Sequence, residues 1–514
     1  MKSSESSLPS KLSASPGDLS STLLVCLLLA LTAGLSAWWV FAHGYILYYG
    51  DAQSHLNLSR SIIDSRTPGY DQLGTVWLPI LHVICLPFVR SMSLWSTGLA
   101  GTIPVALCFV VAGVCFWLAA RDTYRSRNAA WVVIACLALN PNLLYLGTIP
   151  MTEVVFLAGL AVLLLALVRF EITQKRFYLG LGVLASWWMS LTRYDGWFLI
   201  PFAALWFAWS AKCPRWRTFI LFGFLASFAP TYWVAHNWWE TSNPLDFYNG
   251  PYSAIAIQGD KPYPGYHNWA LAAVYYAKAG QLCSGWTLLF TGVAGFIFAL
   301  IKGVYRPIFF LLLTPLFYIW SIHSSKNPIF IPQLPPHGYY NSRYGIAVVA
   351  FAAFASGAIL MALPARWKTW AAAIPVIAVL PWLITPSQEN WICWKESQIN
   401  SMSRRAWTRA GADFLRANYM MGQGILTPSA SGDIAGIFCR ARIPLRETIN
   451  IGNGPLWMAN TARPDLIHQQ LWAVAQQDDS LSLNLAGPGS PYQVRNKITV
   501  KGAPALDILE RGYK

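Results

Sequence analysis

Charge is scarce in this 514-residue chain: only 11% of its residues are Asp, Glu, Lys or Arg, whereas 55% are hydrophobic. An average soluble domain carries about 25% charged residues, so the composition excludes an ordinary soluble protein. Apolar runs of about 17 to 25 residues recur along the chain, which is the length needed to cross a hydrocarbon core of roughly 30 Å. These runs, separated by short basic segments, predict a helical membrane bundle rather than a barrel.

Recognisable cysteine motifs are also absent. The nine cysteines form no Cys-x-x-Cys pair and no Cys/His spacing of a metal site. Most of them lie in apolar runs, where we interpret them as inert core residues. Of the cysteines expected to face outward, Cys393 and Cys439 are candidates for a disulfide, with two free thiols as the alternative. We predict no cofactor and no metal.

The basic residues are not gathered into one patch, although the net charge is +15. A nucleic-acid partner is therefore not expected. The positive-inside rule explains the charge better, because cytoplasmic loops of membrane proteins are enriched in Lys and Arg. The basic segments that we place in the cytoplasm are 121–127, 169–177, 211–217, 302–306 and 365–368.

Hydropathy predicts about eleven transmembrane helices. They lie near 21–42, 97–120, 128–146, 152–169, 178–192, 196–211, 218–236, 286–301, 307–323, 344–363 and 369–385. The apolar stretch 75–89 is short and contains two prolines, so we interpret it as a juxtamembrane or re-entrant helix at the outer interface. Counting it as a crossing would reverse all later spans and place the basic segments outside.

The predicted fold is an all-α polytopic membrane bundle with a small C-terminal extracytoplasmic domain. Residues 1–20 form a cytoplasmic tail, residues 21–385 the membrane module, and residues 386–514 the soluble domain. The first outward loop covers 43–96. The C-terminal region mixes charged and apolar residues with turns rich in Gly and Pro, which indicates an α/β or α+β fold. No A-x-A-like cleavage site follows the first apolar run, so we expect an uncleaved helix.

Asp51 begins an amphipathic segment in the first outward loop, within YYGDAQSHLNLSRSIIDS. A carboxylate just outside the first membrane helix stands where a membrane-embedded substrate would emerge. The alternative is an N-cap, which Asp also favours. His55 lies four residues later and could share a helix face with Asp51, but a metal site needs three or four ligands.

Two further outward turns contain ionisable residues. Glu153 ends the motif PMTE at the start of a span, where an ionisable group close to lipid is a functional candidate and a helix-start residue favoured by the dipole is the alternative. Arg193 and Asp195 lie together in TRYDGW, either as site residues or as an ion pair.

A phosphate contact is expected from arginine, whose planar fork matches phosphate oxygens. Arg343 in YYNSRYG, at the outer start of a span, is the first candidate, with an interface anchor as the alternative. Arg193 and Lys261 are weaker candidates.

The order of these elements resembles the GT-C glycosyltransferases. A membrane helix, an aromatic pair, Gly-Asp, an amphipathic helix and a Pro-containing juxtamembrane helix precede the second span. The similarity covers roughly residues 20–385 and is greatest to the protein O-mannosyltransferase and lipid A aminoarabinose transferase branch. It implies that Asp51 acts on the acceptor, that Glu153 is a second carboxylate, and that Arg343 with Tyr344 forms the Arg-Tyr pair common in the family. The sequence departs from the O-mannosyltransferases in having Asp-Ala instead of Asp-Glu and TVWLP instead of a Pro-Pro segment.

We therefore expect an inverting glycosyltransferase that transfers sugar from a polyprenyl-phosphate donor to a lipid, glycan or protein hydroxyl on the outer face of the membrane. Such a reaction needs a base at the acceptor, typically worth about 10²- to 10⁴-fold in rate, and donors at the departing phosphate. A multi-pass transporter or flippase is the alternative. It would show two homologous halves, and no internal repeat is visible in the sequence.

Overall fold

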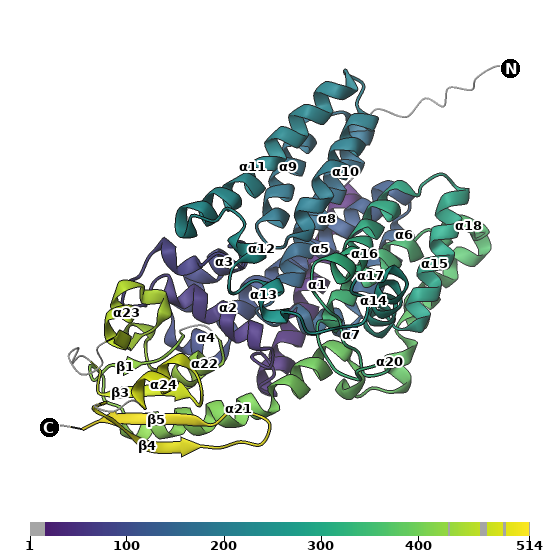
Figure 1. Cartoon of the computed structure of the whole chain (residues 1–514). Coiled ribbons are helices and arrows are strands. Elements are labelled where there is room, and N and C mark those ends of the chain that lie inside the picture. The colour runs from purple at the N-terminus through teal and green to yellow at the C-terminus, as the bar shows by residue number, and fades with distance from the viewer. Residues whose placement is uncertain (1–15, 430–431, 463–469, 487–489, 513–514) are drawn as a thin grey trace. The chain divides into compact units, whose positions relative to one another are not determined.

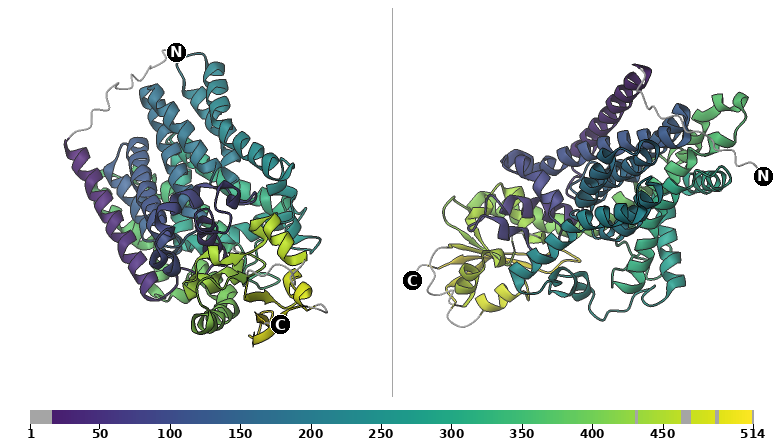
Figure 2. Two further views of the ribbon diagram at one scale, coloured as in Figure 1. Left: turned by 90° about the vertical axis from the view of Figure 1, so that its left-hand side faces the viewer. Right: turned by 90° about the horizontal axis from the view of Figure 1, so that it is seen from above.

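The computed structural model describes residues 16–429, 432–462, 470–486 and 490–512. The chain forms two compact units. Unit 1 comprises Met1–Ala37, Ala106–Gly147 and Thr152–Lys395, and unit 2 comprises Trp38–Val105, Thr148–Met151 and Glu396–Lys514. Figure 1 shows the order of the elements, and both views of Figure 2 show α1 (Pro16–Ala42) as one uninterrupted helix.

The named elements of unit 1 are all helices, and its connecting segments include an isolated antiparallel bridge between Phe330 and Tyr340. Besides most of α1 it contains most of α5 (Leu99–Tyr124), α6 (Arg127–Ala138), α7 (Pro141–Leu146), α8 (Thr152–Thr173), α9 (Arg176–Ser190), α10 (Asp195–Ser210), α11 (Arg215–Thr241), α12 (Asp246–Asn249), α13 (Ala254–Gln258), α14 (Trp269–Ser284), α15 (Trp286–Ile301), α16 (Arg306–Ser324), η2 (Ser342–Gly345), α17 (Ile346–Ser356), α18 (Ile359–Ala362), η3 (Ala365–Ala372), α19 (Ala373–Ala378), α20 (Leu380–Ile384) and η4 (Gln388–Asn390).

Six of the described helices are long and apolar enough to cross a membrane, and α14 with α15 adds a seventh if that bent pair counts as one broken span. The chain is thus a multi-pass membrane protein with the predicted all-α bundle. The predicted spans at 178–192 and 196–211 are the helices α9 and α10, of 15 and 16 residues. The predicted span at 369–385 is divided among η3, α19 and α20.

The bend between α14 and α15 is 107°. It occurs at Gly285, whose φ of 74° lies in the left-handed region that a side chain disfavours. The Gly285 N–H donates to the Gln281 carbonyl at 2.8 Å and closes the last turn of α14. After the bend, α15 packs closely on α17: a Cβ at Gly295 would lie 2.0 Å from the Ala355 carbonyl oxygen. Small residues at such contacts let membrane helices approach closely.

Unit 2 combines short helices of the first loop with the C-terminal region. Its elements are α2 (Gly50–Ser61), η1 (Tyr70–Leu73), α3 (Ile80–Val89), α4 (Met92–Thr97), nearly all of α21 (Ile392–Asn418), β1 (Ile425–Leu426), α22 (Gly432–Ala441), η5 (Leu445–Glu447), β2 (Thr448–Ile449), η6 (Ile451–Asn453), α23 (Pro455–Ala462), β3 (Trp472–Gln476), α24 (Ser480–Leu485), β4 (Tyr492–Ile498) and β5 (Leu506–Arg511). The predicted juxtamembrane stretch contains α3, an apolar helix of ten residues.

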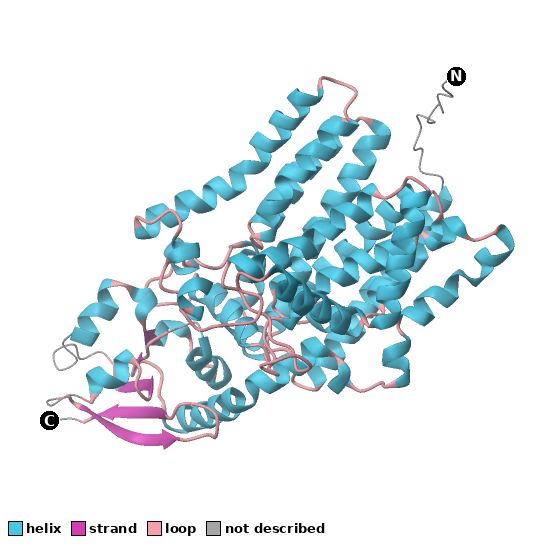
Figure 3. Ribbon diagram, turned by 45° about the vertical axis from the view of Figure 1, so that its right-hand side comes forward, coloured by secondary structure: helices cyan, strands magenta, loops and turns pink. Residues whose placement is uncertain are grey.

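The C-terminal region contains one mixed sheet in the order β2-β1-β3-β5-β4, drawn in magenta in Figure 3. β1 pairs in parallel with β2 and β3, whereas β5 pairs antiparallel with β3 and β4. The register of β4 shifts between Val494 and Asn496, so this edge strand carries a bulge. The C-terminal region thus contains the mixture of helices and strands that the sequence predicted.

Candidate active site

Glu153 lies in the first turn of α8, with its side chain only 2% exposed. Its Oε1 accepts a hydrogen bond from Arg193 Nη1 at 3.2 Å and another from Arg343 Nε at 3.1 Å. Oε2 is buried and has no hydrogen-bond partner in the described part of the chain. One carboxylate oxygen of α8 therefore joins two arginines from distant parts of the sequence.

Arg193 lies in the turn between α9 and α10 and uses all three of its nitrogens. Besides Glu153, Nη1 donates to Thr152 Oγ1 at 2.7 Å, and Nε donates to Asp195 Oδ1 at 3.2 Å. Nη2 donates to the Tyr318 hydroxyl at 2.9 Å, and this hydroxyl donates to Asp195 Oδ2 at 2.9 Å. The closed network fixes the plane of the guanidinium.

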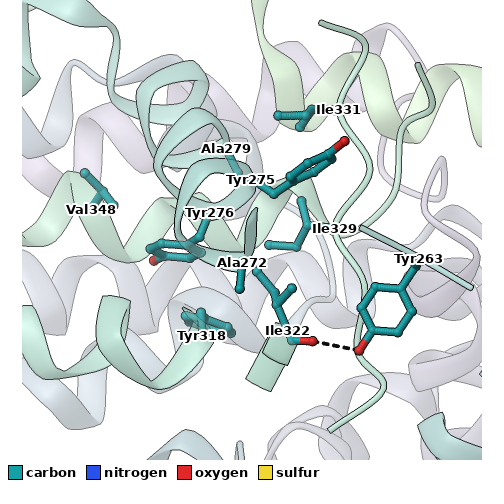
Figure 4. Packing of buried hydrophobic residues seen from close by; sticks show 10 residues of the cluster. All are labelled: Tyr263, Ala272, Tyr275, Tyr276, Ala279, Tyr318, Ile322, Ile329, Ile331 and Val348. Atoms are coloured by element: carbon teal, nitrogen blue, oxygen red, sulfur yellow. Dashed lines mark hydrogen bonds between the residues drawn. The ribbon is translucent and has the colours of Figure 1, made fainter. Parts of the chain in front are cut away.

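Aromatic rings cover the two arginines. The Tyr344 ring centroid lies 5.0 Å from Arg193 Cζ and 5.3 Å from Arg343 Cζ. Tyr318 stacks on Tyr344 with a centroid distance of 4.9 Å and on Tyr276 at 5.6 Å. Figure 4 shows Tyr276 and Tyr318 next to each other within the buried cluster. Cation–π contacts of this kind are strengthened where water is excluded.

Local backbone geometry brings Arg343 to this position. Asn341, with φ of 55°, turns the chain immediately before η2. A Cβ at Gly345 would lie 2.3 Å from the Ala279 carbonyl oxygen, so glycine is required where the end of η2 meets α14. The sequence NSRYG thus supplies both the turn and the close approach.

The cluster contains equal numbers of opposite charges, Arg193 and Arg343 against Glu153 and Asp195. Charges taken out of water must be paired and hydrogen-bonded to persist, and this network provides both. Chemically, it offers arginine donors held in fixed orientations and one buried carboxylate oxygen, Glu153 Oε2, that no described residue occupies.

Asp51 belongs to unit 2. It lies in the first turn of α2, at the helix start that the sequence predicted, and it is half-buried. α2 buries many polar side chains, among them Gln53, Asn57 and Ser59. Asn57 Oδ1 accepts hydrogen bonds from Gln53 Nε2 at 3.0 Å and from Trp95 Nε1 at 3.2 Å. A buried helix made mostly of polar residues is unusual for a simple core element and marks α2 as a functional candidate.

His55, one turn after Asp51, pairs with His82 of α3. Its Nδ1 lies 2.9 Å from His82 Nε2, and its ring lies 4.3 Å from the Trp77 ring centroid. Burial, and secondarily the neighbouring His55, lower the pKa of His82 well below its ordinary value of 6.5. His82 is therefore neutral at neutral pH.

Of the residues singled out in the sequence, Glu153, Arg193, Asp195, Arg343 and Tyr344 converge in unit 1. Asp51 and His55 lie on one helix of unit 2. Lys261 is exposed, and its carbonyl accepts from Gln258 Nε2 at 2.8 Å, outside the cluster. Sequence reasoning missed Tyr318, Thr152 and the partnership of His82 with His55. Tyr318 lies in the middle of an apolar run, where a tyrosine reads as an ordinary packing residue.

The nine cysteines are free thiols, so the alternative of a Cys393–Cys439 disulfide is wrong. Cys439 is buried in unit 2, where Sγ lies 3.5 Å from the Trp95 carbonyl oxygen. Cys393 is buried in unit 1, 3.9 Å from Cys283 Sγ. Each sulfur thus has a neighbour of its own. Among the described residues no group of three or more His, Cys, Asp or Glu is arranged to hold a metal ion.

Comparisons with protein families and solved structures find proteins similar to this chain. Residues 91–239 match the family of dolichyl-phosphate-mannose-protein mannosyltransferases. The fold is similar to the crystal structure of ArnT from Cupriavidus metallidurans bound to undecaprenyl phosphate, with a TM-score of 0.57 at 14% sequence identity, over 96% of this chain and 98% of that one. No curated protein sequence matches the chain. The resemblance seen in the sequence is thereby confirmed: the chain has the GT-C fold, and these similarities indicate a glycosyltransferase.

Proposed function

We propose that this chain transfers a sugar from a polyprenyl-phosphate donor to a hydroxyl group of a lipid, glycan or protein acceptor on the outer face of the membrane. The observation that carries the proposal is the convergence of Glu153, Arg193 and Arg343 in one buried cluster. The undecaprenyl phosphate bound to the structurally similar ArnT supports a lipid-linked donor.

In the proposed reaction the acceptor hydroxyl attacks the anomeric carbon of the donor, the bond from that carbon to the phosphate oxygen breaks, and configuration inverts. Negative charge grows on the departing polyprenyl phosphate. Arg343 and Arg193 are the proposed donors to its oxygens, because preorganised donors in a dry site stabilise developing charge strongly. The planar guanidinium of Arg343 matches the geometry of phosphate oxygens, and the Tyr344 ring holds this guanidinium in place.

Glu153 has a double role in this proposal. Its Oε1 orients both arginines, and Oε2, buried without a described partner, is available to accept a hydrogen bond from a substrate hydroxyl. Asp195 and Tyr318 hold Arg193 from the opposite side and are positioning residues.

Asp51 is the proposed base that takes the proton of the acceptor hydroxyl. Support comes from its position directly after the first membrane helix and from the buried polar surroundings of α2. The outward orientation is supported by the basic loops, which the positive-inside rule assigns to the cytoplasm together with the N-terminus. The C-terminal domain would then be extracytoplasmic.

The test is transfer of radiolabelled sugar from defined polyprenyl-phosphate donors by the purified full-length protein. Asp51→Asn should abolish transfer while the elution volume and helix content stay unchanged. Asp71→Asn, an exposed carboxylate of the same loop, is the matched control and should retain full transfer. Wild-type turnover by Asp51→Asn would refute its role as the base. Transport of the lipid-linked sugar across vesicles by wild-type protein, with no covalent transfer, would favour the flippase alternative.

A further inference from the structure

Unit 2 contains a second basic site, apart from the residues proposed for transfer. It is a cavity of about 250 Å³ lined by residues of three segments: 41–53, 96–97 and 404–440. Arg404 and Arg405 of α21 and Arg440 of α22 contribute its positive charge. Among the lining residues, whose side chains the structure describes, there is no carboxylate.

Neutral groups of unit 2 contact two of these arginines and fix their orientation. Arg404 Nη2 donates to the backbone carbonyls of Leu47 at 3.2 Å and Tyr48 at 2.6 Å. The Arg405 guanidinium stacks over the Tyr48 ring, with Cζ 3.7 Å from the centroid, and its Nε donates to Ser401 Oγ at 2.9 Å. A stacked guanidinium keeps its in-plane donors directed past the ring edge, which is how arginine meets phosphate oxygens.

Positive charge also accumulates around Arg440. Burial is the main cause that lowers the pKa of Arg440, and the guanidinium groups of Arg409 and Arg416 add to it, whereas Asp413 and Cys439 raise it. The contributions of Arg409 and Arg416 to this shift are repulsions between like charges. An anion in the cavity would relieve this repulsion.

The other wall of the cavity is apolar and adjoins a candidate membrane span. Phe41, Ile46 and Leu47 line it. Phe41 lies in the last turn of α1, whose segment Leu19–Ala42 is long and apolar enough to cross a membrane. The exposed side chains of Trp38 and Phe41, at 66% and 42%, mark this turn as a membrane-interface position. A ligand with an anionic head and an apolar tail matches both walls.

We propose that this cavity binds the phosphate headgroup of an anionic membrane lipid, whose chains lie along the end of α1. The lipid is a ligand of unit 2 and not a reactant of transfer. Its binding would tie α21 and α22 to the membrane surface through Arg405 and Arg440.

The test uses full-length protein, delipidated in detergent and titrated with phosphatidylglycerol, phosphatidylcholine or inorganic phosphate, with bound lipid counted by native mass spectrometry. The double variant Arg405→Gln with Arg440→Gln should weaken phosphatidylglycerol binding by about 30-fold, since each arginine near a membrane surface contributes about 1 kcal/mol. Arg66→Gln with Arg495→Gln is the control with the same loss of charge, because both residues are exposed and neither lines the cavity. It should bind the lipid to within about threefold of wild type.

A third variant, Ser96→Trp, fills the cavity without changing its charge and should also reduce binding. Equal binding of phosphatidylglycerol by wild type and the Arg405/Arg440 variant would overturn the proposal. Equal affinity for phosphatidylglycerol and phosphatidylcholine would overturn it as well. Binding of inorganic phosphate alone, without lipid preference, would keep the anion site but overturn the lipid as its source. None of these readouts depends on sugar transfer.

Discussion

In unit 1 the buried arginines Arg193 and Arg343 lie against carboxylates, whereas in unit 2 Arg405 lies against an aromatic ring in a cavity without a described carboxylate. Unit 2 also buries an imidazole pair, in which His55 Nδ1 lies 2.9 Å from His82 Nε2. Arg193 and Arg343 are therefore paired with carboxylates, as Arg60 is with Asp64 in unit 2, whereas Arg405 stacks on an aromatic ring at a cavity.

A buried ion-pair network and an open basic site suit different tasks, namely the orientation of hydrogen-bond donors and the binding of anions. A fully paired network holds donors in one orientation but is costly to disturb, because each lost partner leaves a charge without compensation. An uncompensated arginine at a cavity is less rigidly specified but attracts anions. The following variants test whether the units differ in this way.

Glu153→Ala should have the largest effect on stability. It removes the carboxylate that pairs with both Arg193 and Arg343, and loss of one partner of a buried ion pair costs about 3–5 kcal/mol of unfolding free energy. Glu171→Ala, on the same helix, is the control: its pair with Arg306 is more than one-third exposed on both sides, so the cost should be below about 1 kcal/mol. Thermal unfolding in detergent measures both, and equal shifts would contradict the structural importance of the network.

Arg343→Lys should reduce kcat about 10²-fold, equivalent to about 2.7 kcal/mol of transition-state stabilisation. Lysine keeps the charge but lacks the planar fork. Arg306→Lys, at a partly exposed ion pair, should leave kcat unchanged. The measurement is the steady-state rate of labelled-sugar transfer. Identical rates for Arg343→Lys and wild type would show that the fork is not used.

Tyr318→Phe should lower the free energy of unfolding by about 2 kcal/mol, because its hydroxyl joins Arg193 and Asp195 and both would lose a partner. The ring stack with Tyr344 is kept. Tyr276→Phe removes only a 3.3 Å hydrogen bond to a backbone carbonyl and should cost no more than about 1 kcal/mol. Chemical denaturation of the two variants side by side decides whether the hydroxyl or the ring is important.

His82→Gln should change the pH dependence of stability, with the smallest amplitude of the four. The pKa of His82 is lowered in the folded state, so the unfolded chain binds more protons below pH 6.5 and stability falls as the pH decreases. The wild-type protein should lose about 1 kcal/mol between pH 7.5 and pH 5.5 from this residue, and the variant should lose less. His43→Gln, an exposed site, should leave the pH profile unchanged.

Much of the fold follows from hydropathy, because long apolar helices are dictated by the need to satisfy backbone groups in lipid. The sequence did not reveal α14, since Lys278 and Gln281 lower its apolar character, and the bend at Gly285 depends on packing that hydropathy does not report. The predicted span at 369–385 is interrupted at Val379, between α19 and α20, and Pro381 has no N–H to donate across this break.

For the candidate site, ionisable residues at outward helix ends could be chosen from sequence because charge near lipid is costly and rare. Their convergence could not be, since Glu153, Arg193 and Arg343 meet only through the packing of α8, α10 and η2. Tyr318 carried no signal, because a hydroxyl inside an apolar helix looks the same whether it joins two charged residues or none.

The bulged edge strand β4 has a consequence for how the protein behaves in crowded membranes. An open sheet edge invites another strand to add to it and so promotes aggregation. Here Arg495 and Lys497 are exposed on that edge, and the bulge between Val494 and Asn496 interrupts its regular hydrogen bonding. Like charges and a distorted backbone would discourage two such edges from joining, so neighbouring copies can display this sheet side by side without fusing into a larger one.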